Sequence, residues 1–215
     1  MNPIGIFGGT FDPIHFGHLR TAFELQQALE LGELRFVPAG RPPLRDAPLA
    51  DAGLRLAMVR AAIEDQPGFT VDDREVRREG PSYTVTTLAE LRAEAPLRPV
   101  CLLVGMDAFL GLHRWHHWRE ILQLAHVAVA HRPGWRAPTD GALGELLAER
   151  GTSRVSDLRD EGAGRIFVHP VTQLEISSTD LRNIIVSGRD PRYLVPDAVR
   201  AIIRETGCYS PKATR

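Results

Sequence analysis

Two histidines that stand three residues apart are the first candidates for chemistry. His15 and His18 lie in the block Gly8-Gly9-Thr10-Phe11-Asp12-Pro13-Ile14-His15-Phe16-Gly17-His18. If this turn is helical, the two imidazoles project from one face and can donate hydrogen bonds to oxygens that gain charge during phosphoryl transfer. The glycines of the block let the backbone approach a phosphate closely. The block therefore predicts a nucleotide site.

A structural interpretation of the same block is that both histidines lie in an ordinary surface turn. Their position between glycines, directly after an apolar run that reads as a first strand, favours a functional role. Asp12 is different, because a carboxylate in such a loop commonly accepts hydrogen bonds from backbone N–H groups. We expect Asp12 to hold the loop rather than to take part in the reaction.

A second block near the C-terminus, Ile176-Ser177-Ser178-Thr179-Asp180-Leu181-Arg182, puts small hydroxyls at the start of an expected helix. Such a start favours anions, and Ser178 and Arg182 can donate hydrogen bonds to the β- and γ-phosphates of a nucleotide. The alternative is an ordinary Ser/Thr cap followed by an exposed arginine.

Three central segments could bind a second substrate: Pro81-Ser82-Tyr83-Thr84, Gly105-Met106-Asp107 and Trp115-His116-His117-Trp118. The N–H groups after Ser82 favour an anion, Asp107 can accept hydrogen bonds from ribose hydroxyls, and Trp115 offers a flat face to an aromatic ring. Alternatively, the tryptophans belong to the core and Asp107 caps a helix.

A metal site is a weaker interpretation of the histidines at 113, 116 and 117. Histidines at this spacing on a helix can share a cation, but no carboxylate or thiolate with ligand spacing accompanies them. We predict no protein-held metal ion.

Apolar runs and helical stripes indicate the elements that position these residues. Strands are expected at residues 3–7, 34–37, 69–71, 100–104, 126–130 and 166–168. The first helix is expected at 18–31 with a cap at Gly32. Three further helices are expected to be capped by their first residue: from Asp51 to Pro67 with a stripe at Leu54, Ala57, Met58 and Ala61, from Ser82 through Leu91, and from Ser177 or Ser178 through Ile185. Two more helices are expected around 143–148 and from Pro196 to Gly207. Alternating strands and helices predict an α/β fold, a Rossmann-like doubly wound parallel sheet with C-terminal helices.

The whole chain of 215 residues has the size and composition of one globular domain, 1–215, whose helical part 176–215 carries the second block. A formal net charge of -1 argues against a nucleic-acid partner. No apolar run is long enough for a membrane span. Two cysteines are too few for a disulfide framework, so a cytoplasmic location is expected, and Cys101 reads as core. The sequence is compatible with a homo-oligomer as well as a monomer.

The first block resembles the H-x-G-H signature of the nucleotidyltransferase superfamily, and the second resembles its I-S-S-T-x-[IL]-R motif. The three central segments, with residues 40–45 and 131–134, resemble in order and spacing the acceptor site of nicotinate-nucleotide adenylyltransferases. The resemblance covers nearly the whole chain. It implies transfer of AMP from ATP to nicotinate mononucleotide in NAD biosynthesis, with Mg²⁺ accompanying ATP.

The resemblance also assigns residues to each substrate. His15 and His18 would be the catalytic pair. The implied ATP-binding residues are Gly8, Gly9, Thr10, Phe11, Gly17, Gly105, Ser178 and Arg182. The implied acceptor-binding residues are Arg45, Ser82, Tyr83, Thr84, Asp107, Trp115, His116 and Arg132. In the family, main-chain N–H groups matching Thr84 and His116 hold the ring carboxylate.

One segment departs from the family pattern. The proline loop often reads P-P-H-K or P-P-H-R, whereas this chain has Pro42-Pro43-Leu44-Arg45. Leu44 cannot donate a hydrogen bond, so any role of that histidine is absent or moved, for example to Arg41. Two other functions remain open: a pantetheine-phosphate adenylyltransferase, for which the chain is long, and a non-catalytic nucleotide-binding regulator, which could dispense with both histidines and Arg182.

Overall fold

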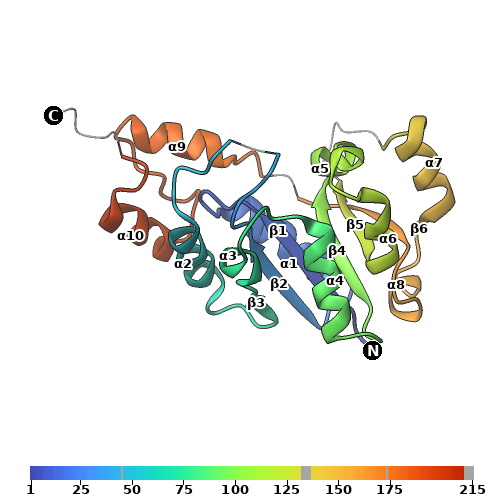
Figure 1. Ribbon diagram of the computed structural model, residues 1–215. Coiled ribbons are helices and arrows are strands. Elements are labelled where there is room, and N and C mark those ends of the chain that lie inside the picture. Colours follow the sequence, from blue (N-terminus) through green and yellow to red (C-terminus); the bar gives the residue numbers. More distant parts are fainter. Residues whose placement is uncertain (45, 132–136, 173, 211–215) are drawn as a thin grey trace.

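Seven strands, all parallel, form one sheet in the order β3-β2-β1-β4-β5-β7-β6 (Figure 1). This computed structural model describes residues 1–44, 46–131, 137–172 and 174–210. The strands are β1 Ile4–Gly9, β2 Glu33–Pro38, β3 Phe69–Val71, β4 Val100–Gly105, β5 His126–His131, β6 Gly151–Thr152 and β7 Ile166–Pro170. The predicted parallel α/β sheet is confirmed.

The helices are α1 Phe16–Ala28, α2 Ala52–Ile63, α3 Arg74–Arg77, α4 Thr84–Glu94, α5 Met106–Leu110, α6 Ile121–Leu124, α7 Gly141–Arg150, α8 Asp157–Asp160, α9 Ser178–Val186 and α10 Asp197–Thr206, with 3-10 turns η1 Leu112–Arg114 and η2 Trp118–Glu120. From β1 the chain continues outward through β2 to β3, and it then returns to β4 on the other side of β1. In a doubly wound sheet, ligands bind beside the carboxyl ends of the strands at such a switch point.

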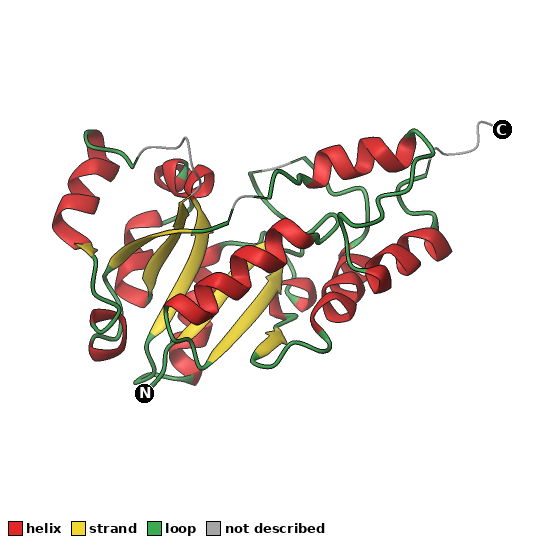
Figure 2. Ribbon diagram, turned by 180° about the vertical axis from the view of Figure 1, so that it is seen from behind, coloured by secondary structure: helices red, strands yellow, loops and turns green. Residues whose placement is uncertain are grey.

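Side chains of the central strands alternate between two buried layers. In β4, Cys101 and Leu103 pack with residues from α1, α2, α9 and α10, whereas Leu102 and Val104 pack with residues from α4, α5 and α7. Figure 2 shows α1 crossing one face of the sheet. Because both faces are covered, the central strands are continuous apolar runs rather than alternating ones. Burial of Cys101 confirms its prediction as core.

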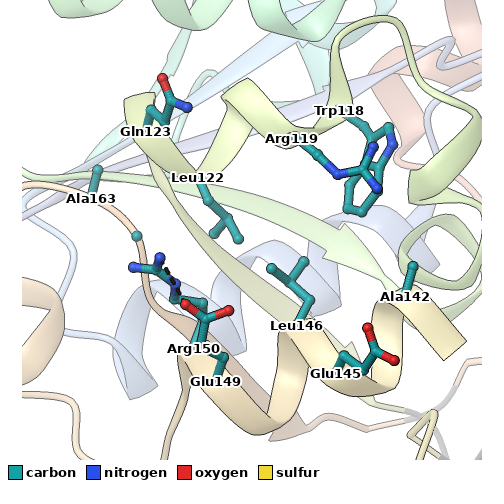
Figure 3. A pocket seen from close by; sticks show the side chains of 11 residues that line it. Trp118, Arg119, Leu122, Gln123, Ala142, Glu145, Leu146, Glu149, Arg150 and Ala163 are labelled. Carbon is teal, nitrogen blue, oxygen red and sulfur yellow. Dashed lines mark ion pairs between the residues drawn. The ribbon is translucent and has the colours of Figure 1, made fainter. Parts of the chain in front are cut away.

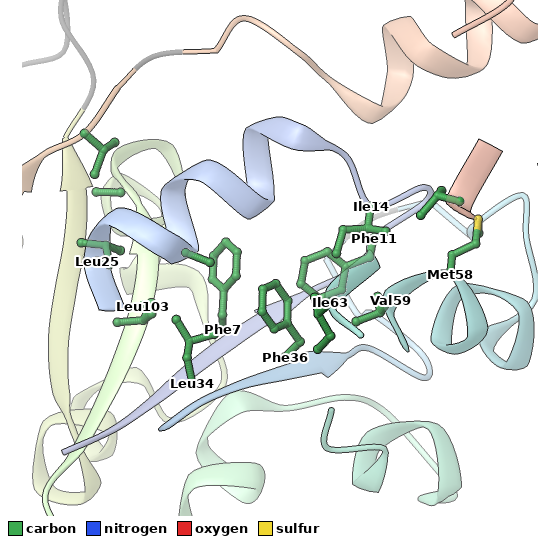
Figure 4. Packing of buried hydrophobic residues seen from close by; sticks show 14 of the residues in the cluster. Phe7, Phe11, Ile14, Leu25, Leu34, Phe36, Met58, Val59, Ile63 and Leu103 are labelled. Atoms are coloured by element: carbon green, nitrogen blue, oxygen red, sulfur yellow. The ribbon is translucent and has the colours of Figure 1, made fainter. Parts of the chain in front are cut away.

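An aromatic cluster supports the end of β1 that leads into the first block (Figure 4). Phe7 lies with its ring centroid 5.9 Å from that of Phe11 and 5.6 Å from that of Phe36. Met58 and Val59 of α2 close the cluster from one side, and both are fully buried. The loop that follows β1 therefore starts from a rigid base.

Two helix details differ from the sequence prediction. Helix α1 ends at Ala28 rather than near Gly32, because Glu30 takes a left-handed conformation (φ 51°) and Leu31 N–H bonds to the carbonyl oxygen of Gln26. In α2 the predicted stripe is wrong at Ala57, which is exposed, because the buried face is turned toward Arg55 and Val59.

Several short elements have no prediction in the sequence: α3, α5, α6, α8 and the two-residue strand β6. Each is too short to show a helical or alternating period. Strand β6 pairs with β7 at the sheet edge, and α7 precedes it as expected. Within the described parts of the chain, no helix is both long and apolar enough to cross a membrane.

Candidate active site

The histidine pair lies where β1 passes into α1. His15 is the extended residue before the helix, and His18 N–H closes the first turn on the His15 carbonyl oxygen at 3.0 Å. The two rings stack with centroids 3.7 Å apart and an interplanar angle of 28°. The phenyl ring of Phe11 stands edge-on to His18, 5.1 Å away. The prediction that both imidazoles share one face is confirmed.

Two glycines shape the space around this pair. A Cβ atom built on Gly8 would have no heavy atom within 4 Å, so the backbone at Gly8 borders open space. A Cβ atom on Gly17 would lie 3.0 Å from the His15 ring and 3.4 Å from the Ile176 carbonyl oxygen. Glycine at position 17 therefore lets α1, His15 and the C-terminal block come together.

The start of α9 is joined to the first block by side-chain hydrogen bonds. Ser178 Oγ donates to the carbonyl oxygen of Pro13 at 3.0 Å, across 165 residues of sequence. Arg182 Nη1 donates to the carbonyl oxygen of Asp12 at 2.7 Å. Ser177 caps the helix by accepting from Asp180 N–H at 3.1 Å. The structure thus brings the two predicted phosphate motifs to one place.

Asp12 holds the loop, as expected. Its carboxylate accepts hydrogen bonds from Leu49 N–H at 2.9 Å and Ala50 N–H at 3.2 Å. The hydroxyl of Tyr209, from the segment after α10, donates to the same carboxylate at 2.7 Å. Burial raises the pKa of Tyr209, and the bond to Asp12 raises it further, so the phenol stays protonated and donating.

Ser82 contradicts its prediction as a helix cap. Helix α4 begins after Tyr83, and Ser82 Oγ accepts instead from Gly40 N–H at 2.9 Å and Arg41 N–H at 3.1 Å. The hydroxyl therefore ties the proline loop to the start of α4. The first turn of α4 closes on the Tyr83 carbonyl oxygen, which accepts from Thr86 N–H at 3.1 Å and from Thr87 N–H at 3.2 Å.

Two of the three central segments meet through aromatic rings. Tyr83 stacks on His116 with ring centroids 4.2 Å apart and an interplanar angle of 26°. Trp115 and Trp118 are both partly buried and pack against the core layer of α4 and α5, so each combines core packing with an exposed surface. Asp107 is exposed in the first turn of α5, two residues after β4 ends at Gly105.

A family model described as Cytidylyltransferase-like matches residues 6–184. A curated relative from Aeromonas hydrophila, "Probable nicotinate-nucleotide adenylyltransferase", is 48% identical over 209 residues, which is 97% of this chain and 98% of the relative. A relative with the same name from Acidithiobacillus ferrooxidans is 48% identical over 205 residues, 95% of this chain and 94% of the relative. The chain belongs to the nicotinate-nucleotide adenylyltransferases.

The fold of this adenylyltransferase matches a solved member of that activity class. The Plasmodium falciparum nicotinic acid mononucleotide adenylyltransferase, complexed with NaAD, aligns with a TM-score of 0.76 over 97% of this chain and 98% of that chain. The two sequences are only 14% identical, so this comparison shows a shared fold.

Two residues expected at the acceptor site of the adenylyltransferase, Arg45 and Arg132, lie outside the described residues. Leu44, which departs from the family pattern, is exposed. In the described ranges no group of three His, Cys, Asp or Glu side chains could hold a metal ion. His117 instead lies 2.6 Å from the Glu120 carboxylate through Nδ1.

Two cavities differ in their relation to the site. One of about 590 Å³ opens between η2, α6 and α7, is lined by Trp118, Leu122 and Leu146 among others, and includes only Trp118 from the three central segments (Figure 3). A second, of about 300 Å³, is formed by the proline loop at Gly40, Arg41 and Pro42. Ser82, which the sequence predicts to bind the acceptor, accepts a hydrogen bond from Gly40 N–H of this loop.

Sequence reasoning missed two buried polar residues beneath the site, Arg55 and Tyr209. Both have only 1–2% of their surface exposed. Arg55 precedes the buried Met58 and Val59 by three and four residues, so a charged side chain on an apolar helix face was the signal available. Tyr209 follows the last helix, where the sequence shows no pattern.

Proposed function

We propose that the chain transfers the adenylyl group of ATP to nicotinate mononucleotide, giving nicotinate adenine dinucleotide and pyrophosphate. The observation that carries this proposal is the meeting of the stacked His15 and His18 with the start of α9 beside the open end of β1. Membership of the adenylyltransferase family supports the same reaction. We take one domain, residues 1–215, to carry both substrate sites.

The reaction we propose is a direct in-line displacement. A phosphate oxygen of the mononucleotide attacks the α-phosphorus of ATP, a new P–O bond forms, and the bond to the bridging oxygen breaks. Pyrophosphate leaves with that electron pair. The protein contributes positioning and charge stabilisation, and His15 and His18 donate hydrogen bonds to phosphate oxygens as charge develops.

Binding of the triphosphate falls to the start of α9 and the first block. The N–H groups and dipole of a helix start favour phosphate, and Arg182 adds a cation. Ser178 and Arg182 bond to carbonyl oxygens of the first block, which holds both side chains near the histidines. Mg²⁺ enters with ATP as part of the substrate, because phosphate oxygens are the hard ligands it prefers.

Binding of the acceptor falls to the α4 start, the Tyr83–His116 stack and the proline loop. Main-chain N–H groups of Thr84 and His116 would hold the ring carboxylate, and Trp115 would lie against the ring. Leu44 occupies the position of the family histidine. The exposed Arg41, three residues earlier in the same proline loop, can supply a positive charge there. We assign the phosphate of the mononucleotide to this side.

Location of the reaction in the cytoplasm is part of the proposal. Both cysteines, Cys101 and Cys208, are free thiols, as a reducing compartment requires.

One assay separates this function from its two alternatives. The purified chain is incubated with MgATP and nicotinate mononucleotide, or with MgATP and phosphopantetheine, and released pyrophosphate is measured. Release only with the mononucleotide supports the proposal. Release only with phosphopantetheine indicates the other adenylyltransferase, and binding of ATP without release in either mixture indicates a regulator.

The same assay tests the acceptor site through nicotinamide mononucleotide. A site that presents N–H donors to both carboxylate oxygens must face the amide NH₂ with one of them. Such a mismatch costs about 1–3 kcal/mol, so kcat/KM should favour the acid by about 10- to 100-fold. Equal values for the acid and the amide would contradict the assignment of Thr84 and His116.

A further inference from the structure

Arg55 of α2 is a buried cation beneath two loops that approach different substrates. One is the ATP loop, residues 8–18. The other is the acceptor loop, residues 40–44 and 46–50. Only 1% of the Arg55 surface is exposed, and burial lowers the pKa of its guanidinium. A charge placed there needs partners that compensate for the loss of water.

Those partners are carbonyl oxygens of both loops. Arg55 Nη1 donates to the Thr10 carbonyl oxygen at 2.6 Å, Nη2 to the Gly40 carbonyl oxygen at 3.3 Å, and Nε to the Ala50 carbonyl oxygen at 3.2 Å. The guanidinium plane thereby fixes one point of the ATP loop relative to both ends of the acceptor loop. Arginine can do this because its donors are held rigidly in one plane.

The Asp12 carboxylate forms a second link between the same loops. It belongs to the ATP loop, and its oxygens accept from Leu49 and Ala50 N–H in the acceptor loop. The opposite charge of Asp12 raises the pKa of Arg55 against the effect of burial. Arg55 and Asp12 therefore stabilise one relative position of the two loops.

We propose that Arg55 is a positioning residue that couples the ATP site to the acceptor site. It touches neither substrate in this assignment. It sets the distance between the ATP loop and the acceptor loop, on which in-line attack depends. The proposal rests on the proposed function, because the acceptor loop is assigned to nicotinate mononucleotide.

Arg92 provides a matched control at the opposite edge of the sheet. Like Arg55 it bonds to carbonyl oxygens, namely those of Leu124, Pro96, Arg98 and Gly162, at 2.5–3.2 Å. Burial lowers its pKa as well. None of these partners belongs to either substrate loop.

The test measures KM for ATP, KM for nicotinate mononucleotide, kcat and Tm for wild type, Arg55→Lys and Arg92→Lys. Lysine keeps the charge, but one nitrogen cannot reach three carbonyl oxygens in different directions. Arg55→Lys should raise both KM values together, by about five- to fiftyfold each, which lies within the range of typical coupling between sites, and it should lower kcat because in-line attack depends on the distance between the loops. Arg92→Lys should lower Tm and leave both KM values within about twofold, as expected for an independent site.

Tyr209→Phe gives a second measurement that does not depend on Arg55→Lys folding. It removes only the hydroxyl that orients the Asp12 carboxylate, so both KM values should rise together by a smaller factor. A rise in one KM alone, or a fall in Tm with both KM values unchanged, overturns the proposal. If wild type itself releases no pyrophosphate, the failure lies in the proposed function instead.

Discussion

The carboxyl ends and the amino ends of the parallel strands, called here the carboxyl edge and the amino edge of the sheet, use the same residue types for different purposes. At the carboxyl edge, Arg55 bonds to carbonyl oxygens and His15 stacks on His18. At the amino edge, Arg92 bonds to carbonyl oxygens, and the fully buried His126 bonds to the Glu161 carbonyl oxygen at 2.9 Å.

The difference between the edges lies in what surrounds these side chains. At the carboxyl edge, residues 10–15 connect β1 to α1 and residues 39–51 connect β2 to α2, and the backbone at Gly8 borders open space. At the amino edge, Arg92 and His126 bond to carbonyl oxygens of the segment 161–162 that precedes β7. Val100 N–H, at the start of β4, bonds to the Gly162 carbonyl oxygen of the same segment. Polar side chains at the amino edge thus serve stability, whereas those at the carboxyl edge leave room for a ligand.

Replacing one histidine at each edge tests this difference most strongly. His18→Ala should lower kcat by about two to three orders of magnitude, the usual loss when a donor to transition-state charge is removed. Its Tm should change little. His126→Ala should instead lower the free energy of unfolding by about 2–4 kcal/mol, through a cavity and lost hydrogen bonds, with kcat retained.

Activity assays and thermal unfolding of the two variants decide the matter. If His18→Ala turned over at near the wild-type rate, His18 would have no part in the reaction. If His126→Ala lost turnover while staying folded, the two edges would not be separable in this way.

Replacing one glycine at each edge tests the acceptor loop. A Cβ atom on Gly40 would lie 2.1 Å from the Glu75 carbonyl oxygen, so Gly40→Ala must displace the acceptor loop. Overpacking of this kind costs about 1–3 kcal/mol, and KM for nicotinate mononucleotide should rise about tenfold, more than KM for ATP. Gly162→Ala is the control, because its Cβ atom would meet no heavy atom within 4 Å. If Gly40→Ala left KM for nicotinate mononucleotide unchanged, this loop would not take part in binding the mononucleotide.

Two serines at opposite ends of α9, Ser178 in its first turn and Ser187 just after its last residue, give a narrower test at the ATP side. Ser178 Oγ donates to the Pro13 carbonyl oxygen, and Ser187 Oγ makes the same kind of bond to the Ile184 carbonyl oxygen at the other end of the helix. Ser178→Ala should raise KM for ATP about three- to tenfold, the effect of one hydrogen bond, and leave KM for the mononucleotide unchanged. Ser187→Ala should change neither. A rise in the acceptor KM instead would mean that the start of α9 serves the other substrate.

Much of the carboxyl edge could be predicted from sequence because its motifs are local. Strand, glycine loop and helix follow one another in the first block, and their order predicted both the parallel sheet and the shared face of His15 and His18. A cap at Ser177 or Ser178 was also predicted, and the structure places it at Ser177; the predicted end of the last helix at Gly207, with φ 61°, is confirmed. The roles of these residues stay predictions.

The contacts that join distant segments could not be predicted in this way. Ser82 looked like a helix cap because it precedes an amphipathic stretch, but its hydroxyl bonds to Gly40 and Arg41 N–H, 42 and 41 residues away. Tertiary packing also turned α2 so that Arg55 is buried. Such outcomes depend on where loops meet in space, which no local period encodes.

The smallest expected effect concerns the amino edge alone and is a pH dependence of stability. Arg165 N–H donates to His126 Nδ1 at 3.1 Å, so Nε2 carries the proton that is donated to Glu161 and the folded ring is neutral. Burial lowers the pKa of His126, the hydrogen bond to Glu161 and its charge oppose part of this shift, and the charges of Arg92 and Arg165 lower the pKa further. Because the unfolded chain then binds a proton more readily than the folded one, the contribution of neutral His126 to the free energy of unfolding is complete above the ordinary histidine pKa of about 6.5 and is lost as pH falls below it.

Urea unfolding of wild type and His126→Asn between pH 5 and 7.5 measures this contribution. The wild type should lose more stability than the variant toward pH 5, while KM for ATP, which depends on the other edge, should be equal in both at pH 7.5. Parallel stability curves for the two proteins would show that His126 does not titrate within this range.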